Sequence, residues 1–243
     1  MSQIKVELQN FFGSDRAIAE AAWTSSLSYQ SKKTKSDEDV ARIVAMLANA
    51  GHSVPFESVI FRWWIKMPIA IDRQFATHRI ASNSGLSGRY RRMPTEYLKM
   101  PDDVAAISDK LPKVDQYTLM DGSTVIHGAR DAFHDYIKIC EEANNSYGAL
   151  TSIANNEFKL GNITEAEYKR FREFMRGQLP QHNMTERVSI MNLRSWSNFI
   201  KLRNSPHAQP EIRQVAELML ECAKAANICP VALTVLEKNK WVI

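Results

Sequence analysis

The sequence predicts an α+β fold in which helices pack against an antiparallel sheet. Two stretches near the start, residues 4–12 and 58–66, alternate between apolar and polar side chains, which is the periodicity of strands. From Gly128 onward, apolar residues recur every three or four positions, which is the periodicity of helices. Strands that come early and helices that come late favour α+β over alternating βαβ units.

The first expected strand is IKVELQNFF, residues 4–12, whose loose alternation suits the edge of a sheet. A helix is expected over residues 36–51. Ser36 can cap its first turn with Asp39 at the third helical position, and Gly51 can end it in a left-handed conformation. One face of this helix is apolar and consists of Val40, Ile43, Val44 and Leu47.

The second strand is expected over residues 58–66, and Pro68 stands where a helix can begin. Residues 101–127 show little pattern and are expected to be rich in loops. Four later runs have helical spacing. These are Tyr136 to Ile139, Phe171 to Met175, Trp196 to Leu202 and Ile212 to Met219.

Composition limits the class of protein. With 243 residues and 44% hydrophobic content, the chain can build one full-sized core, so a single domain over residues 1–243 is expected. No apolar run reaches the roughly 20 residues that span a bilayer, and the N-terminus lacks the pattern of a signal peptide. The net charge of +4 fits either phosphate-bearing ligands or an ordinary basic surface.

The cysteines and histidines give little support to metal, disulfide or thiol chemistry. The three cysteines, Cys140, Cys222 and Cys229, form no CxxC pair and have no neighbouring base to activate a thiolate. The six histidines show no HxxxH or HxH spacing, so no metal site is expected. Free cysteines of this kind fit a reducing cytoplasm, which is the expected location.

Two polar segments are candidates for ligand binding. Residues 73–92 combine arginines, which can grip phosphate oxygens in a bidentate way, with Gly85 and Gly88, which allow a backbone to approach an anion closely. Residues 176–209 form the second segment, in which Arg194 and Asn198 share a helix face opposite Trp196. By composition alone, either segment could instead be a solvated surface.

Specific blocks of sequence point further. The segment THRIASNSGLSGRY, residues 77–90, resembles the RHR…SGRY signature of the flavin-dependent thymidylate synthases. GHSVPFE (51–57), LP with NLRS (179–180 and 192–195) and NFIKLRNSPHAQPEIR (198–213) are similar to three further blocks of that family, in the same order. The resemblance covers most of residues 20–100 and 174–230. The middle segment, residues 101–170, does not visibly match and is longer than usual.

The resemblance implies a single α+β domain of the flavin-dependent thymidylate synthase type with FAD as cofactor. It implies that the flavin is contacted by His52, Val54, His78, Arg79, Asn192, Leu193, Arg194 and Asn198. It implies that the nucleotide is bound by Gln74, Leu86, Ser87, Gly88, Arg89, Arg176 and Arg203, with Ser87 and Arg89 near the phosphate. Arg203 would also be catalytic, because a cation beside the pyrimidine favours loss of its N3 proton and makes C5 nucleophilic.

The function that the resemblance implies is methylation of dUMP at C5 to give dTMP. Methylene tetrahydrofolate would supply the carbon and NADPH the electrons, and the protein would be a homotetramer with shared sites that binds neither membrane nor nucleic acid. Since the flavin performs the difficult step, no cysteine nucleophile is required. Two alternatives stay open: a related C5 modification such as hydroxymethylation or use of dCMP, and a relative without catalysis that binds nucleotides or nucleic acid.

Three features depart from the family's signature. Thr77 replaces the first arginine of the RHR triplet, which removes one expected flavin contact. Gly85 stands where the family usually has glutamate, and Asn83 and Ser84 are the residues before it. These changes fall inside the expected site, so they bear on the choice of nucleotide more than on the fold.

Overall fold

The computed structural model describes residues 3–110, 116–118, 120–122, 124–126 and 132–241. Its contacts group into two compact units. One consists mainly of Ser87–Met184, and the other of Ile4–Leu86 with Thr185–Ile243. We call them the helical unit and the sheet unit and describe each by itself. The expected α+β class is confirmed, whereas the expected single-domain organisation stays a prediction.

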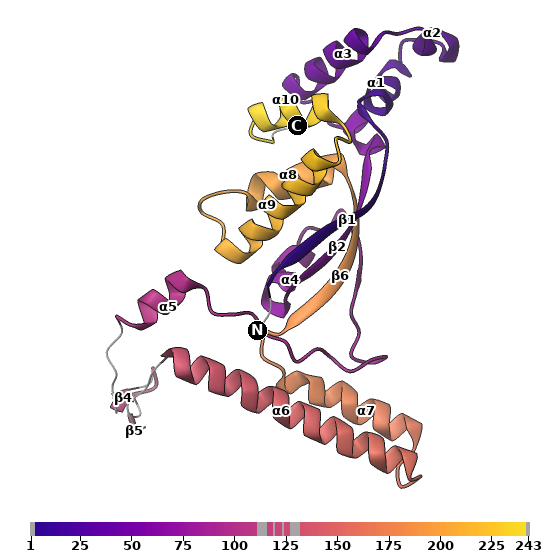
Figure 1. Cartoon of the computed structure of the whole chain (residues 1–243). Coiled ribbons are helices and arrows are strands. Elements are labelled where there is room, and N and C mark those ends of the chain that lie inside the picture. Colours follow the sequence, from indigo (N-terminus) through magenta and orange to yellow (C-terminus); the bar gives the residue numbers. More distant parts are fainter. Residues whose placement is uncertain (1–2, 111–115, 119, 123, 127–131, 242–243) are drawn as a thin grey trace. The chain divides into compact units, whose positions relative to one another are not determined.

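A four-stranded sheet forms the centre of the sheet unit (Figure 1). Its strands lie in the order β1 (Lys5–Phe12), β2 (Ile60–Pro68), β6 (Met184–Asn192) and β3 (Ser82–Gly85). The β1–β2 and β3–β6 pairs are antiparallel, with Val6 opposite Ile65 and Gly85 opposite Arg187. The expected edge strand at the N-terminus and the expected strand near residue 60 are both confirmed.

The helices of the sheet unit pack an aromatic core against the sheet. Phe61 and Trp63 of β2 are fully buried, as the alternation predicts, and Trp63 stacks on Trp196 with ring centroids 6.3 Å apart. Phe61 meets the edge of Trp196 at 5.2 Å. The helices are α1 (Asp15–Trp23), α2 (Tyr29–Lys33), α3 (Asp37–Asn49), the 3₁₀ turn η1 (Val54–Ser58), α4 (Ile69–Ala76), α8 (Leu193–Arg203), α9 (Pro210–Ala225) and α10 (Pro230–Lys238).

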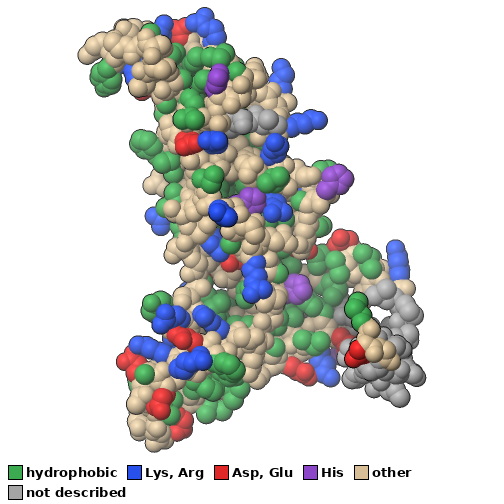
Figure 2. All heavy atoms as spheres, turned by 180° about the vertical axis from the view of Figure 1, so that it is seen from behind, with side chains coloured by type: hydrophobic (Ala, Val, Ile, Leu, Met, Phe, Trp, Pro, Cys, Tyr) green, Lys and Arg blue, Asp and Glu red, His purple; other side chains and the backbone are tan. Residues whose placement is uncertain are grey.

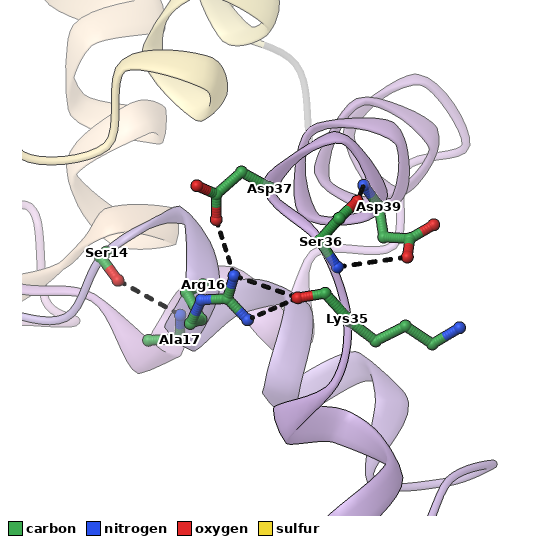
Figure 3. A network of polar contacts seen from close by, with 7 residues as sticks. All are labelled: Ser14, Arg16, Ala17, Lys35, Ser36, Asp37 and Asp39. Atoms are coloured by element: carbon green, nitrogen blue, oxygen red, sulfur yellow. Dashed lines mark hydrogen bonds and ion pairs between the residues drawn. The ribbon is translucent and has the colours of Figure 1, made fainter.

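The start of α3 confirms the expected capping box. The Ser36 hydroxyl accepts a hydrogen bond from the Asp39 backbone at 3.2 Å, and the Asp39 carboxylate accepts one from the Ser36 backbone (Figure 3). Arg16 of α1 donates to the Lys35 carbonyl and to the Asp37 carboxylate, which lies 2.7 Å away, so α1 is tied to the first turn of α3. Local sequence therefore sets where this helix begins.

Of two expected boundaries, the end of α3 agrees with the expectation and the start of α4 differs slightly from it. Gly51 follows the C-cap of α3 and has a φ of 72°, which confirms the left-handed position that glycine favours. Pro68 is the N-cap of α4 and not its first helical residue, because β2 continues two residues further than the alternation indicated.

The C-terminal half is mostly helical, as expected, but it also contributes a strand that the periodicity did not indicate. Residues 184–192 form β6, which lies between two other strands of the sheet. The polar segment SNSG forms β3, although it contains no residue with high strand propensity. Both strands form because their backbone groups pair with each other. This interaction joins distant segments, so the local periodicity of the sequence does not predict it.

The helical unit is built around two long helices that pack side by side, α6 (Ala132–Lys159) and α7 (Glu165–Met175) (Figure 1). Its core is formed by Tyr147, Met175 and Leu179. The segment expected to be rich in loops contains α5 (Asp102–Ser108) and a hairpin of β4 (Gln116–Thr118) and β5 (Thr124–Ile126), while other parts of it lie outside the described residues. The 3₁₀ turn η2 (Arg176–Gln178) follows α7 directly.

Two buried side-chain amides, those of Asn144 and Asn183, hold residues 94–95 near the start of this unit in place. Asn183 donates to the Asn144 side-chain oxygen at 2.6 Å, and Asn144 donates back at 3.2 Å. The remaining donors reach the carbonyls of Pro94 and Thr95. Because every amide group has a partner, burial of the pair is tolerated and residues 94–95 are held in place.

Candidate active site

The sheet unit contains a cavity of about 550 Å³ beside α8. Five residues that the sequence assigned to the flavin or the pyrimidine line it, namely His78, Arg79, Arg194, Asn198 and Arg203. The other lining residues are Glu57, Thr77, Ile80, Met191, Ser195, Ser197, Lys201, Leu202 and Trp241. We call this space the α8 cavity. Segments that are more than a hundred residues apart in the sequence therefore share one site.

The periodicity of α8 decides which of its side chains face the cavity. Leu193 and Trp196 are fully buried against the sheet unit's core, whereas Arg194 and Asn198 are exposed, as expected from their spacing. Asn192 caps the helix, since its side-chain oxygen accepts a hydrogen bond from the Ser195 backbone at 2.9 Å. The NLRS block thus begins the helix and directs its polar face outward.

Arg203 is fixed by the histidine of the signature. Its Nε donates to Nε2 of His78 at 3.0 Å, so that ring nitrogen carries no proton. The imidazole is also held by the edge of Phe199, with centroids 4.9 Å apart. The terminal nitrogens of Arg203 have no hydrogen-bond partner within the described part of the chain. They are therefore available to a ligand in the α8 cavity.

The environment of His78 keeps its ring neutral. Burial first, and the Arg203 charge second, lower the pKa of His78 from 6.5 to about 4. A neutral imidazole can accept the hydrogen bond from Arg203, whereas a protonated one would repel it.

This pKa shift predicts a pH dependence of stability. Because the folded-state pKa of His78 lies below its unfolded value, the stabilisation is present above pH 6.5 and is lost as the pH falls through about 4. We expect a His78→Gln variant to lose less stability than the unchanged chain over this interval. Melting temperatures of both proteins between these pH values measure the difference, and parallel curves would contradict the prediction.

Two further contacts order the rim of the α8 cavity. Arg194 Nη1 lies 2.6 Å from a carboxylate oxygen of Glu57, which joins α8 to η1. Thr77, which replaces the family's arginine, donates its hydroxyl to the Gln74 carbonyl at 2.7 Å and caps the end of α4. Thr77 thus lines the cavity with a short side chain and adds no cation to it.

Several expected flavin residues lie elsewhere. His52 and Val54 line a different cavity of about 560 Å³, together with Trp23, Met46 and Leu47. The Leu193 side chain is fully buried, so the expectation that it contacts the cofactor can hold only for its backbone. Its amide already donates to the Val59 carbonyl at 2.8 Å.

The expected nucleotide residues are distributed over both units. In the sheet unit, Gln74 donates to the Gln209 side chain at 2.6 Å, and the Leu86 amide donates to the Glu186 carbonyl at 2.9 Å. Neither Gln74 nor Leu86 lines the α8 cavity. Ser87, Gly88, Arg89 and Arg176 belong to the helical unit.

In the helical unit, residues 87–91 form a tight turn, here called the SGRY turn. The Ser87 carbonyl accepts from the amides of Tyr90 and Arg91, at 3.1 and 3.3 Å, and the Ser87 hydroxyl accepts from the Arg89 amide at 3.3 Å. A Cβ on the buried Gly88 would lie 2.9 Å from Cδ of Arg176. Glycine therefore lets the Arg176 side chain pass directly over the turn, which brings together four of the residues expected to bind the nucleotide.

Gly85, by contrast, is not required by the backbone. A Cβ at this position would meet only the Glu186 carbonyl, at 3.8 Å. The end of β3 thus has room for a side chain, and the glycine leaves that space open.

The structure agrees with the expectation that no thiol is activated. Burial raises the pKa of Cys140, Cys222 and Cys229, so each sulfur stays protonated near neutral pH. Within the described residues there is no cluster of side chains that could hold a metal ion, and no helix combines the length and apolarity needed to cross a bilayer.

The sequence did not indicate Glu57, Ser197 or Trp241 as lining residues. Ser197 is 1% exposed, and its hydroxyl has no hydrogen-bond partner among the described residues. Ser197 lies four residues after Leu193 and one after Trp196, so it is on the apolar face of α8. A small polar residue at such a position could have been noticed in the sequence. Glu57 is the last residue of the GHSVPFE block, so a signal for it was available, whereas Trp241 lies outside every block and no local pattern could reveal it.

Comparisons with known proteins identify the family of this chain. The sequence profile of the family described as "Thymidylate synthase complementing protein" matches residues 7–231, which include the middle segment. The flavin-dependent thymidylate synthase of Rickettsia bellii is 32% identical over 231 residues, covering 90% of this chain and 71% of the relative. That of Thermus thermophilus is 31% identical over 219 residues, with the same two shares.

Solved structures show that the fold is shared. A UMP/dUMP methylase, PolB from Streptomyces cacaoi, bound with 5-Br dUMP, superposes with a TM-score of 0.69 at 22% identity, covering 99% of this chain and 97% of that chain. The sequence matches cover most of the chain, and the signature blocks occur in the family's order. Residues from these blocks also line the α8 cavity. These findings lead to one assignment of family. The chain belongs to the flavin-dependent thymidylate synthase family and is an enzyme.

Proposed function

We propose that this enzyme methylates C5 of dUMP to give dTMP, with FAD as cofactor, methylene tetrahydrofolate as carbon donor and NADPH as reductant. One observation carries the proposal: the α8 cavity gathers His78, Arg79, Arg194, Asn198 and Arg203 from two distant segments of the sheet unit. The family's dependence on flavin supports the choice of FAD.

The residues of the α8 cavity fit a large, partly anionic group such as FAD. Arg79 and Arg194 supply positive charge, Asn198 supplies an amide, and the buried Ser197 hydroxyl lacks a partner within the described chain. Apolar surface comes from Ile80 and Trp241. When bound, the flavin supplies the hydride that completes the methyl group.

Arg203 acts on the pyrimidine in this proposal. His78 holds the guanidinium through Nε, so the terminal nitrogens can face the base and stabilise the negative charge left when N3 loses its proton. That charge spreads to C5 and makes it a nucleophile toward the methylene carbon. The protein supplies a fixed cation, which costs no reorganisation during the reaction.

The SGRY turn binds the nucleotide's phosphate in this proposal. The Ser87 hydroxyl and the guanidinium of Arg89 and Arg176 are donors of the kind that phosphate oxygens accept. We further propose that the enzyme is a cytoplasmic homotetramer in which subunits share sites, as the family resemblance implies.

A second candidate is a different C5 modification on the same scaffold, with a hydroxymethylated product or with dCMP or UMP as substrate. Two observations favour it: Thr77 lines the α8 cavity with a short side chain, and Gly85 leaves open space two residues before the SGRY turn. PolB, which shares the fold, also has a structure with 5-Br UMP. A role in binding nucleic acid is less favoured, since Figure 2 shows acidic and basic side chains mixed on the face drawn, without one large basic surface.

The test is a product assay. Purified protein is expected to carry the visible absorption band of flavin and to convert dUMP to dTMP, identified by mass spectrometry, when methylene tetrahydrofolate and NADPH are supplied. dCMP and UMP are assayed in parallel. A hydroxymethylated product, or turnover of dCMP alone, would replace the first proposal by the second, and protein without flavin or turnover would contradict both. Light scattering of the same sample measures the expected tetramer.

A further inference from the structure

Arg172 of α7 is a buried cation in an unusual environment. The residue is 9% exposed, and no carboxylate among the described residues lies within ion-pair distance of it. Its guanidinium lies over the ring of Tyr168, 5.2 Å from the centroid. Its Nε is buried and has no hydrogen-bond partner in the described part of the chain. Burial of an arginine without a counter-charge destabilises a fold, so stability alone does not explain this residue.

Among the described residues, the one polar contact of the Arg172 side chain is with the SGRY turn. Nη2 donates to the backbone carbonyl of Arg89. Glu173, the next residue along α7, accepts from Nε of Arg89 at 2.6 Å. Arg176, four residues after Arg172, crosses Gly88. Three side chains from one helical stretch thus hold the backbone and the side chain of the same short turn.

The charges around the turn do not balance. Arg89, Arg172 and Arg176 are positive, and among the described residues the one carboxylate in an ion pair with any of them is Glu173, which pairs with Arg89. The excess is positive, and part of it is buried with Arg172. A dianionic phosphate at the turn would supply the missing negative charge.

We propose that Arg172 is a positioning residue for the phosphate of the nucleotide, acting through the carbonyl of Arg89. By holding this carbonyl, Arg172 fixes the conformation in which the Ser87 hydroxyl and the Arg89 side chain are presented together. This inference rests on the proposed function, because that function places a nucleotide phosphate at the turn. Arg172 lies outside every sequence block that resembles the family's signature.

The experiment compares a ligand that has a phosphate with one that lacks it. Dissociation constants for dUMP and for deoxyuridine are measured with flavin-loaded protein, unchanged or carrying Arg172→Met. We expect Arg172→Met to weaken dUMP binding about 10- to 100-fold, the scale of one lost charged hydrogen bond. Deoxyuridine binding and flavin content are expected to stay the same, which a general loss of structure would not produce.

Two further variants complete the design. Arg170→Met removes an exposed arginine from the same helix and is the matched control, expected to bind dUMP like the unchanged protein. Arg172→Lys keeps the charge and most of the packing, so it tests the inference even if the Met variant does not fold. It is expected to recover part of the dUMP affinity, because an ammonium cannot reproduce the guanidinium geometry.

The outcomes separate the inference from the proposed function. If the unchanged protein prefers dUMP to deoxyuridine and both Arg172 variants keep the full preference, the inference is overturned and the function stands. If the unchanged protein shows no such preference, the proposed nucleotide site fails and the inference fails with it. A selective loss of dUMP affinity in the Arg172 variants, absent in Arg170→Met, supports the inference.

Discussion

Arg203→Ala is expected to lower turnover by about 10²- to 10³-fold while the protein keeps its flavin, because one preorganised charge contact to the reacting base is removed. Arg203 is the last residue of α8, and its Nε is held by His78 at 3.0 Å. Arg203→Lys should recover only part of the activity, since an ammonium cannot bond His78 and the base with the same geometry. Single-turnover rates with dUMP, together with the flavin absorption of each variant, measure both effects.

A simpler role for Arg203 makes a different prediction. A cation in the last turn of a helix is stabilised by the helix dipole, an effect of about 0.3–1 kcal/mol. If that were its whole role, Arg203→Ala would lower the melting temperature slightly and leave turnover unchanged. Arg213→Ala is a suitable control, because Arg213 lies on α9 and pairs loosely with Glu217, with 3.6 Å between Nε and Oε1.

Asp72→Asn is expected to cause a large loss of stability. The Asp72 carboxylate of α4 accepts two hydrogen bonds from Arg187 of β6, at 2.5 and 2.8 Å, and the Arg187 side chain is only 12% exposed. Removing one charge of a buried pair costs roughly 3–5 kcal/mol, and the partial exposure of Asp72 places this pair at the lower end. Urea unfolding of the variant measures the change in the free energy of unfolding.

An exposed ion pair provides the control for Asp72. Glu217→Gln breaks the ion pair between Glu217 and Arg213, whose side chains are 50% and 35% exposed respectively. It should lower the free energy of unfolding by less than about 1 kcal/mol. A double change, Asp72→Leu with Arg187→Met, should be more stable than Asp72→Asn, because no unpaired charge then remains buried. Equal stability of Asp72→Asn and Glu217→Gln would show that the α4–β6 pair is not a strong constraint.

Local features of the fold could be predicted from sequence because they depend on neighbouring residues. The capping box of Ser36 and Asp39, the left-handed Gly51 and the buried alternation of Phe61 and Trp63 all involve contacts within a few positions. β6 could not be predicted in the same way. It is a strand because it lies between β2 and β3, and such pairing overrides weak local preference.

The candidate site shows the same division. The motif blocks indicated Arg79, Arg194, Asn198 and Arg203, and the fold brings all four to the α8 cavity. The motifs also suggested cofactor contacts for His52 and Val54, which line another cavity. A motif records which residues occur together in a family, but it does not record which face of the fold each one occupies.

The sequence by itself determined the family, the α+β class and the arginines and amides available for binding. Only the tertiary structure decided that His78 is a neutral partner of Arg203, that Leu193 belongs to the core, and that Arg172 is buried behind the SGRY turn. The physical reason is that charge, burial and hydrogen bonding are set by contacts between distant segments. Residue type and spacing specify what a side chain can do, and its surroundings in the fold select which of those interactions it makes.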